Sequence, residues 1–497
     1  MPVVAMRGIV KRYGRLTAVD DVDLELAGSE IHGLVGENGA GKTTLMQVLA
    51  GVTLPDAGRI SIDGREVAIG SVSAANTLGI SMVHQHFMLV PSLTVAENLT
   101  LGQEPRNGFL VDRAAARRAV VDLADRFGLG VDPDARVRDL GVGALQRVEI
   151  LRALFRGAAI LILDEPTAIL SPPEAEGLFR VLRELAAAGR TIVLVSHRLE
   201  EILASATRIT VLRDGRVTAR LRSAETNAAE LARAMVGRDV ALALDRPPTT
   251  TGRSVLTLDG VRAPGLHRID LEVRAGEIVG VAGVAGNGQA ELAEVVAGLL
   301  RPTAGTVRID GRDVTNATTA ERRAAGLAYI PDDRFRRGLA GDASVRDNLI
   351  MGRHAGKAGA RRVLLDREGA ARRVERLVAS FRIRTADLGA PARTLSGGNA
   401  QRIVVARELA DPHPLVVAAQ PTRGIDVAAS EFVRRALLDR RATGSGVLLI
   451  SADLDEVRSL SDRIVVLHGG RIVSETPASQ VDLVRLGLDM AGVAGGR

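Results

Sequence analysis

The sequence contains two similar halves. Residues 47–64 read QVLAGVTLPDAGRISIDG, and a similar string ends at Gly311, so that Gly51 matches Gly298 at an offset of 247 residues. Further along, DEPT at 164–167 matches AQPT at 419–422 at an offset of 255. Two constant offsets separated by one small insertion indicate two homologous halves. A period of this length is that of whole domains rather than of a solenoid repeat.

Each half alternates short apolar runs with stretches rich in alanine, leucine and arginine. The runs at 191–195 and 447–450 are predicted strands, and the alternation predicts the α/β class, with a mainly parallel sheet flanked by helices in each half. We predict a first domain over 1–239, a linker over 240–253 and a second domain over 254–497. The linker is predicted because its Pro-Pro pair and threonine run cannot continue a helix.

Composition excludes several kinds of site. The 497-residue chain has no cysteine, which excludes disulfide frameworks, thiolate metal sites and cysteine nucleophiles. The net charge is +6, but the basic residues are dispersed among 59 acids, which favours a solvated surface over a nucleic-acid-binding face. No uncharged apolar run reaches the roughly 18 residues of a membrane span, so none is predicted.

A glycine-rich loop predicts a phosphate site in the first half. Residues 36–43, GENGAGKT, fit the pattern G-x-x-x-x-G-K-[ST] between the apolar run 31–35 and a helix-like stretch. Glycines allow backbone amides to surround an anion, lysine reaches the β- and γ-phosphates, and the threonine hydroxyl binds Mg²⁺. We therefore predict ATP and Mg²⁺ as ligands. The predicted binding residues of this loop are Gly36, Glu37, Asn38, Gly39, Ala40, Gly41, Lys42, Thr43 and Thr44.

A second acidic motif complements the loop. The apolar run before Asp164 ends in two acids, Asp164 and Glu165. A carboxylate at the carboxyl edge of a strand beside a phosphate loop suits Mg²⁺, so Asp164 is a predicted metal ligand with Thr43. Glu165 is then left to polarise the attacking water. The alternative is a pair of acids that merely starts a helix.

Together these motifs resemble those of ATP-binding cassette ATPases, over nearly the whole chain. The resemblance implies that Gln85 senses the nucleotide, contacts the metal and meets a membrane partner. It implies that His197 is the switch histidine and that Tyr13 stacks on adenine. The predicted catalytic residues are Glu165, His197 and Gln85. The alternatives are a strand-end histidine at 197 and a packing tyrosine at 13.

The same family has a signature, LSGGQ, that binds the γ-phosphate of ATP held by the opposite domain of a head-to-tail dimer. The second half keeps it as LSGGN at 395–399, whereas the first half reads LGVGA at 140–144. The resemblance implies that Ser396, Gly397 and Gly398 act in trans, together with the D-loop aspartate Asp426. The first half has Ser171 in place of that aspartate.

The second half departs from the family in the complementary way. Its phosphate loop has Gln289 and Ala290 in place of Lys42 and Thr43. The other replacements are Ala419 and Gln420 for the two acids, Asp332 for Gln85, and Ala452 for His197. We therefore predict an internal pseudo-dimer with one hydrolytic and one degenerate site. Whether the degenerate site holds nucleotide stays open.

A closer resemblance is to the fused ATP-binding subunit of bacterial importers for monosaccharides and nucleosides, leaning toward nucleosides. It rests on LVPSLTVAENL, LDEPTAILSPPE, YIPDDR and AAQPTRGID. It implies permease subunits and a substrate-binding lipoprotein as partners, no nucleic acid, and a peripheral position at the cytoplasmic face of the cell membrane. The apolar residues 87–91 are interpreted either as part of a docking groove or as core.

Two other function classes remain as alternatives. A tandem ATPase acting on ribosomes or nucleic acid would also be basic, but such proteins usually carry a long charged linker or zinc-binding cysteines. A scaffold that binds ATP without hydrolysing it would not need the complete set of Lys42, Asp164, Glu165 and His197.

Overall fold

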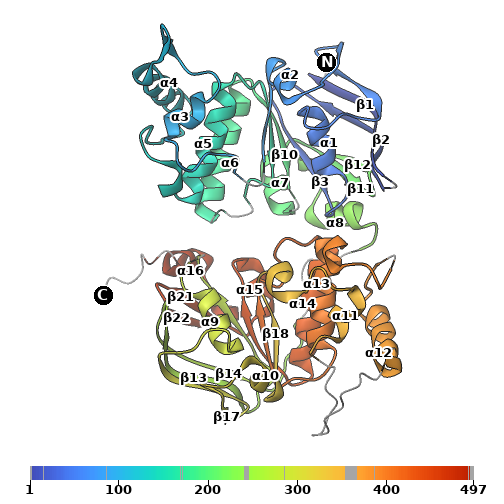
Figure 1. The fold of residues 1–497 in the computed structure, drawn as a ribbon, viewed down its shortest axis with the longest axis vertical. Coiled ribbons are helices and arrows are strands. Elements are labelled where there is room, and N and C mark those ends of the chain that lie inside the picture. Colours follow the sequence, from blue (N-terminus) through green and yellow to red (C-terminus); the bar gives the residue numbers. More distant parts are fainter. Residues whose placement is uncertain are drawn as a thin grey trace. The chain divides into compact units, whose positions relative to one another are not determined.

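The computed structural model divides into two compact units, Met1–Val240 and Ala241–Arg497. Each unit has its own central sheet and its own hydrophobic core (Figure 1). The structure describes residues 3–14, 16–84, 87–167, 170, 172–196, 198–239, 246–284, 286–352, 367–385, 387–490 and 492.

The central sheet of the first unit has six strands. In hydrogen-bonding order they are β12 (Arg216–Arg222), β11 (Arg208–Arg213), β3 (Ile31–Gly36), β10 (Thr191–Val195), β9 (Ile160–Asp164) and β6 (Ile80–Val83). The strands from β11 to β6 are parallel, and only β12 pairs antiparallel. All residues of β3, β9 and β10 are buried, because these strands are covered on both faces.

A second, antiparallel sheet packs against the first. Its order is β2 (Leu16–Leu26), β1 (Val4–Tyr13), β4 (Ala57–Ile62) and β5 (Arg65–Val67). One core cluster joins Met6 of β1, Leu34 of β3 and Leu45 of α1 (Lys42–Leu49). This packing holds α1 against both sheets, with its first residue close behind the carboxyl end of β3.

The remaining helices of the first unit flank these sheets. They are α2 (Val72–Thr77), α3 (Val95–Thr100), α4 (Arg113–Arg126), α5 (Val142–Phe155), α6 (Pro172–Ala187), α7 (Leu199–Ser205) and α8 (Ala228–Val236), with a short hairpin of β7 (Arg106–Asn107) and β8 (Leu110–Val111). Figure 1 shows α3, α4 and α5 on one side of the central strands and β1 and β2 on the other. This group of helices forms a helical subdomain beside the central sheet.

The second unit repeats this architecture. Its central sheet is, in order, β22 (Arg471–Pro477), β21 (Arg463–His468), β15 (Ile278–Ala282), β20 (Gly446–Ile450), β19 (Leu415–Ala419) and β18 (Leu327–Ile330). Its antiparallel sheet is β14 (Leu266–Arg274), β13 (Ser254–Ala263), β16 (Ala304–Ile309) and β17 (Arg312–Asp313). The strand orders of the two units correspond one to one. The predicted fold class, two homologous α/β domains, is confirmed.

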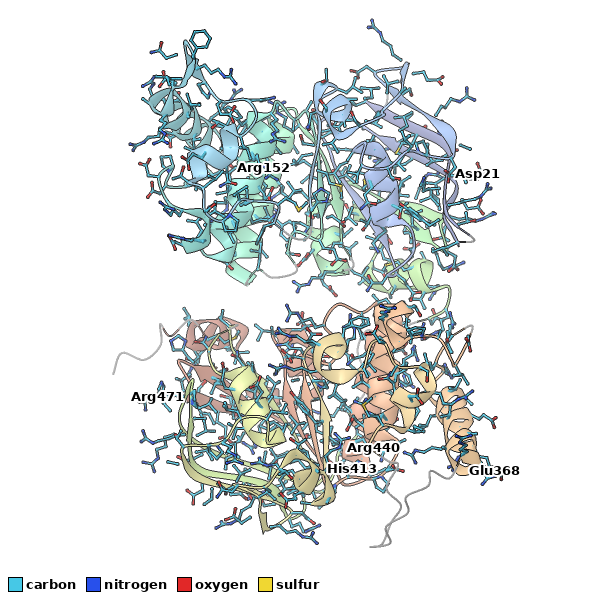
Figure 2. All side chains as sticks on the ribbon, in the orientation of Figure 1. Asp21, Arg152, Glu368, His413, Arg440 and Arg471 are labelled. Atoms are coloured by element: carbon cyan, nitrogen blue, oxygen red, sulfur yellow. The ribbon has the colours of Figure 1, made fainter. Side chains whose placement is uncertain are left out.

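The helices of the second unit correspond as well. They are α9 (Gln289–Ala297), α10 (Thr319–Ala324), α11 (Val345–Ile350), α12 (Arg367–Ser380), α13 (Gly397–Leu409), α14 (Val427–Ala442), α15 (Leu454–Leu460) and α16 (Leu483–Met490). Figure 2 adds the side chains, and those of Glu368 and Arg440 mark α12 and α14. None of the helices within the described ranges has both the length and the apolar character to span a bilayer.

Part of the predicted linker packs against the second unit. The guanidinium of Arg441 donates to the carbonyl of Pro247 at 2.7 Å. The backbone amide of Gly252 donates to the carbonyl of Ala275 at 2.8 Å. Residues 240–245 of the linker lie outside the described residues. Residues 246–253 therefore form an ordered approach to β13, which begins at Ser254.

Candidate functional site

The predicted phosphate loop lies between β3 and α1, as the sequence pattern requires. Gly39 and Gly41 have φ angles of 85° and 95°, in the left-handed region that favours glycine. A Cβ on Gly41 would lie 2.3 Å from the carbonyl oxygen of Ala18, so no side chain fits there. Lys42 starts α1, and its ammonium donates to the carbonyls of Gly36 at 2.7 Å and Glu37 at 2.9 Å.

This arrangement fits the phosphates of a nucleotide. The loop ends at the N-terminus of a helix, whose free amides and dipole favour an anion. No atom lies within 4 Å of the position a Cβ would take on Gly39, so the loop is open at that point. Glu37, Asn38, Ala40 and Thr44 lie where the sequence places them, in the loop and in the first turn of α1.

The two predicted metal ligands lie together. The Thr43 hydroxyl donates to the Asp164 carboxylate at 3.0 Å, which joins the start of α1 to the end of β9. Burial raises the pKa of Asp164, the bond from Thr43 lowers it, and the neighbouring charge of Glu165 raises it. A hydroxyl and a carboxylate are oxygen ligands of the kind that Mg²⁺ prefers, so the donor set fits this ion.

Glu165 has an unusual backbone. Its φ is 48°, and its amide donates to the carbonyl of Val195 at 2.8 Å. A non-glycine residue in this region costs of order 1 kcal/mol and persists only where its surroundings hold it. The corresponding residue of the second unit, Gln420, has a φ of 47°, and its backbone amide donates to the carbonyl of Ile450 at 2.7 Å. The second unit thus keeps the backbone of this position without its carboxylate.

The described part of the second unit's phosphate loop has left-handed glycines at the matching positions, and a neutral side chain in place of the lysine. Gly286 and Gly288 have φ angles of 91° and 106°, and the Gln289 amide donates to the carbonyl of Val284 at 3.0 Å. Ala290 and Ala419 replace the hydroxyl and the carboxylate that face each other in the first unit. This loop therefore lacks the cation and the metal-binding oxygens of its counterpart.

The signature turn, residues 395–399, begins helix α13. Ser396 is the N-cap, and its hydroxyl accepts from the Asn399 amide at 3.4 Å. A Cβ on Gly398 would lie 2.9 Å from a carboxylate oxygen of Asp426, which itself caps α14. Ser396, Gly397, Gly398 and Asp426 are thus brought together. In the first unit α5 starts at Gly141 with no side-chain cap.

Among the other predicted site residues, the structure describes Tyr13 but not Gln85 or His197. Tyr13 ends β1 with 47% of its surface exposed, and the Lys11 ammonium lies 5.5 Å from its ring centre. This exposure favours a stacking role over a packing one. Gln85, His197 and Ser171 lie outside the described residues.

The apolar stretch 87–91 is held from one side and open on the other. The amide of Met88 donates to Glu149 at 2.6 Å, and its carbonyl accepts from Arg152, labelled in Figure 2, at 2.6 Å. The side chains of Met88 and Val90 are 61% and 37% exposed. The core interpretation of this stretch is therefore wrong for these two residues.

Sequence reasoning missed two groups that shape this region. The buried side chain of Asn98 accepts from the backbone amide of Val90 and donates to its carbonyl, which fixes the segment after position 85. In the second unit, the buried side chain of Asn348 makes the same two bonds to Ala340. Arg334 binds backbone carbonyls beside the signature turn. For the two asparagines, the available sequence signal is a polar residue at matching positions of the two halves. For Arg334, it is an arginine that the first half lacks.

Comparison with known proteins gives a consistent picture. The family described as ABC transporter matches residues 19–168 and 266–423. The chain is 44% identical to a glucose import ATP-binding protein, TsgD13, of Haloferax volcanii, covering 99% of this chain and 96% of the relative. It is 42% identical to a guanosine import ATP-binding protein, NupO, of Bacillus subtilis, covering 99% and 97%. A ribose import ATP-binding protein, RbsA 1, of Rubrobacter xylanophilus is 44% identical, covering 99% and 98%.

Among solved structures, an archaeal ribosome recycling factor in complex with a ribosomal stalk protein resembles the chain with a TM-score of 0.64. It covers 98% of this chain and 92% of that one, at 20% identity. Identity this low shows a shared fold and no more.

Proposed function

The chain belongs to the ABC transporter family, and on this premise we propose that it is the energy-coupling subunit of a membrane importer for nucleosides or simple sugars. It is an ATP-binding protein and an ATPase, as members of this family are. The proposal adds that hydrolysis takes place at one of two composite sites. The observation that carries it is the bonded pair of Thr43 and Asp164, next to the loop lysine Lys42, in the first unit; the second unit lacks all three side chains.

In the proposed hydrolytic site the first unit binds the nucleotide. Lys42 exchanges its bonds to the loop carbonyls for bonds to the phosphates, since charge-assisted bonds to phosphate are stronger than those to neutral carbonyls. Thr43 and Asp164 would hold Mg²⁺, which would neutralise phosphate charge. Glu165 accepts a hydrogen bond from the attacking water and orients it. Gln85 and His197 complete this set, with Tyr13 on the adenine.

The second unit supplies the trans groups in this proposal. Ser396 and the amides of Gly397 and Gly398 donate to the γ-phosphate from the N-terminus of α13. Asp426 lies against the same turn and aligns it. The two units therefore act as an internal pseudo-dimer.

The other composite site is proposed to be degenerate. It would combine Gln289, Ala290, Ala419 and Gln420 with the altered signature at 140–144. Gln420 turns its side-chain carbonyl to the amide of Ala452, at 3.2 Å, where the first unit has its switch histidine. Without a loop cation or a carboxylate pair, this site lacks metal binding and water activation.

The partners in this proposal are permease subunits and a substrate-binding lipoprotein. Exposed Met88 and Val90 follow the position of Gln85 and offer an apolar contact for a permease segment. The chain would then work at the cytoplasmic face of the cell membrane. The relatives' names include guanosine, ribose and glucose, which supports a nucleoside or simple sugar as the solute.

Vanadate trapping tests the asymmetry. The full chain is incubated with Mg-ATP and orthovanadate, and the trapped nucleotide is counted per chain. We expect one trapped nucleotide, and none in Lys42→Ala. Two trapped nucleotides per chain would overturn the single hydrolytic site.

Cross-linking tests the head-to-tail arrangement, and a chain without cysteine gives it no background. Asn38→Cys combined with Ser396→Cys should cross-link with a short bifunctional reagent when ATP is present. The matched control, Asn38→Cys with Gly141→Cys, places both thiols in the first unit and should not. Cross-linking of the control pair alone would contradict the proposed pairing.

A further inference from the structure

One arginine lies between the two trans motifs of the second unit. Arg334 follows β18 in the string YIPDDR and opens a five-residue π-helical turn, Arg334–Gly338. The Asp333 carboxylate accepts from the amides of Phe335 at 3.1 Å and Arg336 at 2.9 Å, which fixes the start of this turn. Turns of this kind are rare in proteins, and those that occur are often found at functional sites.

The Arg334 guanidinium binds the segment that carries Asp426. Its Nη1 donates to the carbonyl of Arg423 at 2.7 Å, and its Nη2 donates to that of Gly424 at 2.9 Å. These two carbonyls come just before Asp426 in the chain. A planar fork of two donors fixes adjacent carbonyls in a way that a single ammonium cannot.

The same guanidinium also touches the signature turn. A Cβ on Gly397 would lie 2.7 Å from Nη2 of Arg334 and 3.2 Å from the carbonyl of Gly424. Arg334 therefore lies where the signature turn and the D-loop segment meet. Its Nε is buried and has no hydrogen-bond partner. The arginine is thus anchored through its two terminal nitrogens alone.

The repeat supplies a natural comparison. At an offset of 247 residues, which pairs Asp332 with Gln85, Arg334 corresponds to Phe87. The first unit thus lacks this arginine, and it also lacks the signature serine and the D-loop aspartate, with Gly141 and Ser171 in their places. The arginine occurs in the unit whose trans motifs are complete.

We propose that Arg334 is a positioning residue that holds the signature turn and the D-loop segment of the second unit in register for the hydrolytic site. This inference rests on the proposed function, since it assigns those motifs to the nucleotide bound by the first unit. Arg334 also lies two residues after Asp332, the counterpart of Gln85. It therefore ties the trans motifs to the segment that corresponds, in the first unit, to the one meeting the permease.

Kinetics of the full chain test the proposal. Arg334→Phe, which copies the first unit, should lower kcat for ATP hydrolysis about tenfold or more, because the trans donors lose their alignment. The KM for ATP should change little, since the groups that bind the nucleotide in the first unit are intact. Arg334→Lys should restore only part of the loss, because it keeps the charge without the fork.

A matched control separates positioning from stability. Arg373 is also a partly buried arginine of the second unit, binds Asp411 through two nitrogens at 3.3 and 2.8 Å, and has a buried Nε without a partner. Arg373→Ala should lower the unfolding temperature without changing kcat. Equal losses of kcat in Arg373→Ala and Arg334→Phe, at equal loss of stability, would overturn the proposal.

A readout independent of turnover completes the test. In Arg334→Phe the ATP-dependent cross-link between Asn38→Cys and Ser396→Cys should form more slowly than in the parent pair. An unchanged cross-linking rate together with an unchanged kcat would overturn the role of Arg334. Absence of the cross-link in the parent pair would instead count against the proposed function, so the two failures are distinguishable.

Discussion

The phosphate loops of the two units differ in charge but share, in their described residues, the same left-handed glycines. Lys42 and Gln289 occupy the same position, and each side chain donates to a backbone carbonyl of its own loop. Both loops have left-handed glycines before the helix. A neutral amide is therefore enough to close the loop. In the proposed function, the positive charge of Lys42 binds the phosphates and is not needed for the loop conformation.

Glu165 and its counterpart Gln420 likewise differ in charge but share a backbone conformation. Glu165 and Gln420 share a left-handed backbone and an amide bond to the neighbouring strand. The second unit has this strained geometry with a neutral side chain in place of the carboxylate. Backbone structure is thus common to the two units, and the proposed chemistry depends on a few side chains of one of them.

The largest expected difference concerns these two residues. Glu165→Gln should lower kcat by about a thousandfold or more, because general base catalysis contributes 10²- to 10⁴-fold, while ATP stays bound by Lys42 and Thr43. Gln420→Glu should leave kcat unchanged, since Ala290 and Ala419 offer no metal-binding oxygen. Steady-state phosphate release and equilibrium ATP binding measure both. Unchanged turnover in Glu165→Gln would point to another base.

An ion-pair cluster at the amino end of β3, away from the phosphate loop, should matter next. Glu30 accepts two bonds from Arg208, at 2.8 and 2.7 Å, and lies 3.3 Å from His32. The second unit keeps the pair as Glu277 and Arg463 but has valine at the histidine position. Burial raises the pKa of Glu30, but the bonds from His32, Arg208 and the backbone outweigh it and bring the pKa to about 2.

Glu30→Gln should therefore destabilise the first unit by about 3 kcal/mol at neutral pH, because it leaves the partly buried guanidinium of Arg208 without its counter-charge. The ionised carboxylate stabilises the fold fully above its ordinary pKa of 4.5, and this contribution is lost as the pH falls toward 2. Urea unfolding at pH 7 and pH 3 measures it. The chain has no tryptophan, so Phe127→Trp provides a reporter confined to the first unit. An equal difference at both pH values would contradict the assignment.

The signature serine should have a smaller effect on turnover. Ser396→Ala should lower kcat about 100-fold, the loss expected for one donor to a developing anion. It also removes a helix cap, so Ser344→Ala is the matched control. Ser344 caps α11 by accepting from the Asp347 amide at 3.0 Å, and its loss should cost about 1 kcal/mol of stability without changing kcat. Equal kinetic losses would show that capping, not donation, is responsible.

The smallest expected effect lies in the first unit's altered signature. Gly141 is the uncapped start of α5, has ordinary extended angles, and has open space where a Cβ would stand. Gly141→Ser should stabilise the first unit by about 0.5 kcal/mol through a new cap. Hydrolysis should not change, because the opposite loop has Gln289. Thermal unfolding beside Gly141→Ala, which cannot cap, measures the gain, and a rise in turnover would reveal a second active site.

Much of this protein could be predicted from its sequence. The repeat predicted two homologous α/β units, and the strand orders agree because the same pattern of buried runs builds the same sheet twice. The loop motif placed Lys42 and Thr43 at the start of a helix, and Asp164 ended a buried strand, as predicted. Local residue spacing is enough for such features, since strand, turn and helix are decided by near neighbours.

Contacts between distant segments could not be predicted in this way. The bond between Thr43 and Asp164 joins residues 121 positions apart, and the fork of Arg334 on Arg423 and Gly424 spans about 90. Such contacts depend on which sheet edges and helix starts meet after the chain has folded. The tertiary structure alone decided that Met88 is exposed and that Arg334 lies against the signature turn, because exposure and packing are properties of the assembled layers rather than of any stretch of sequence.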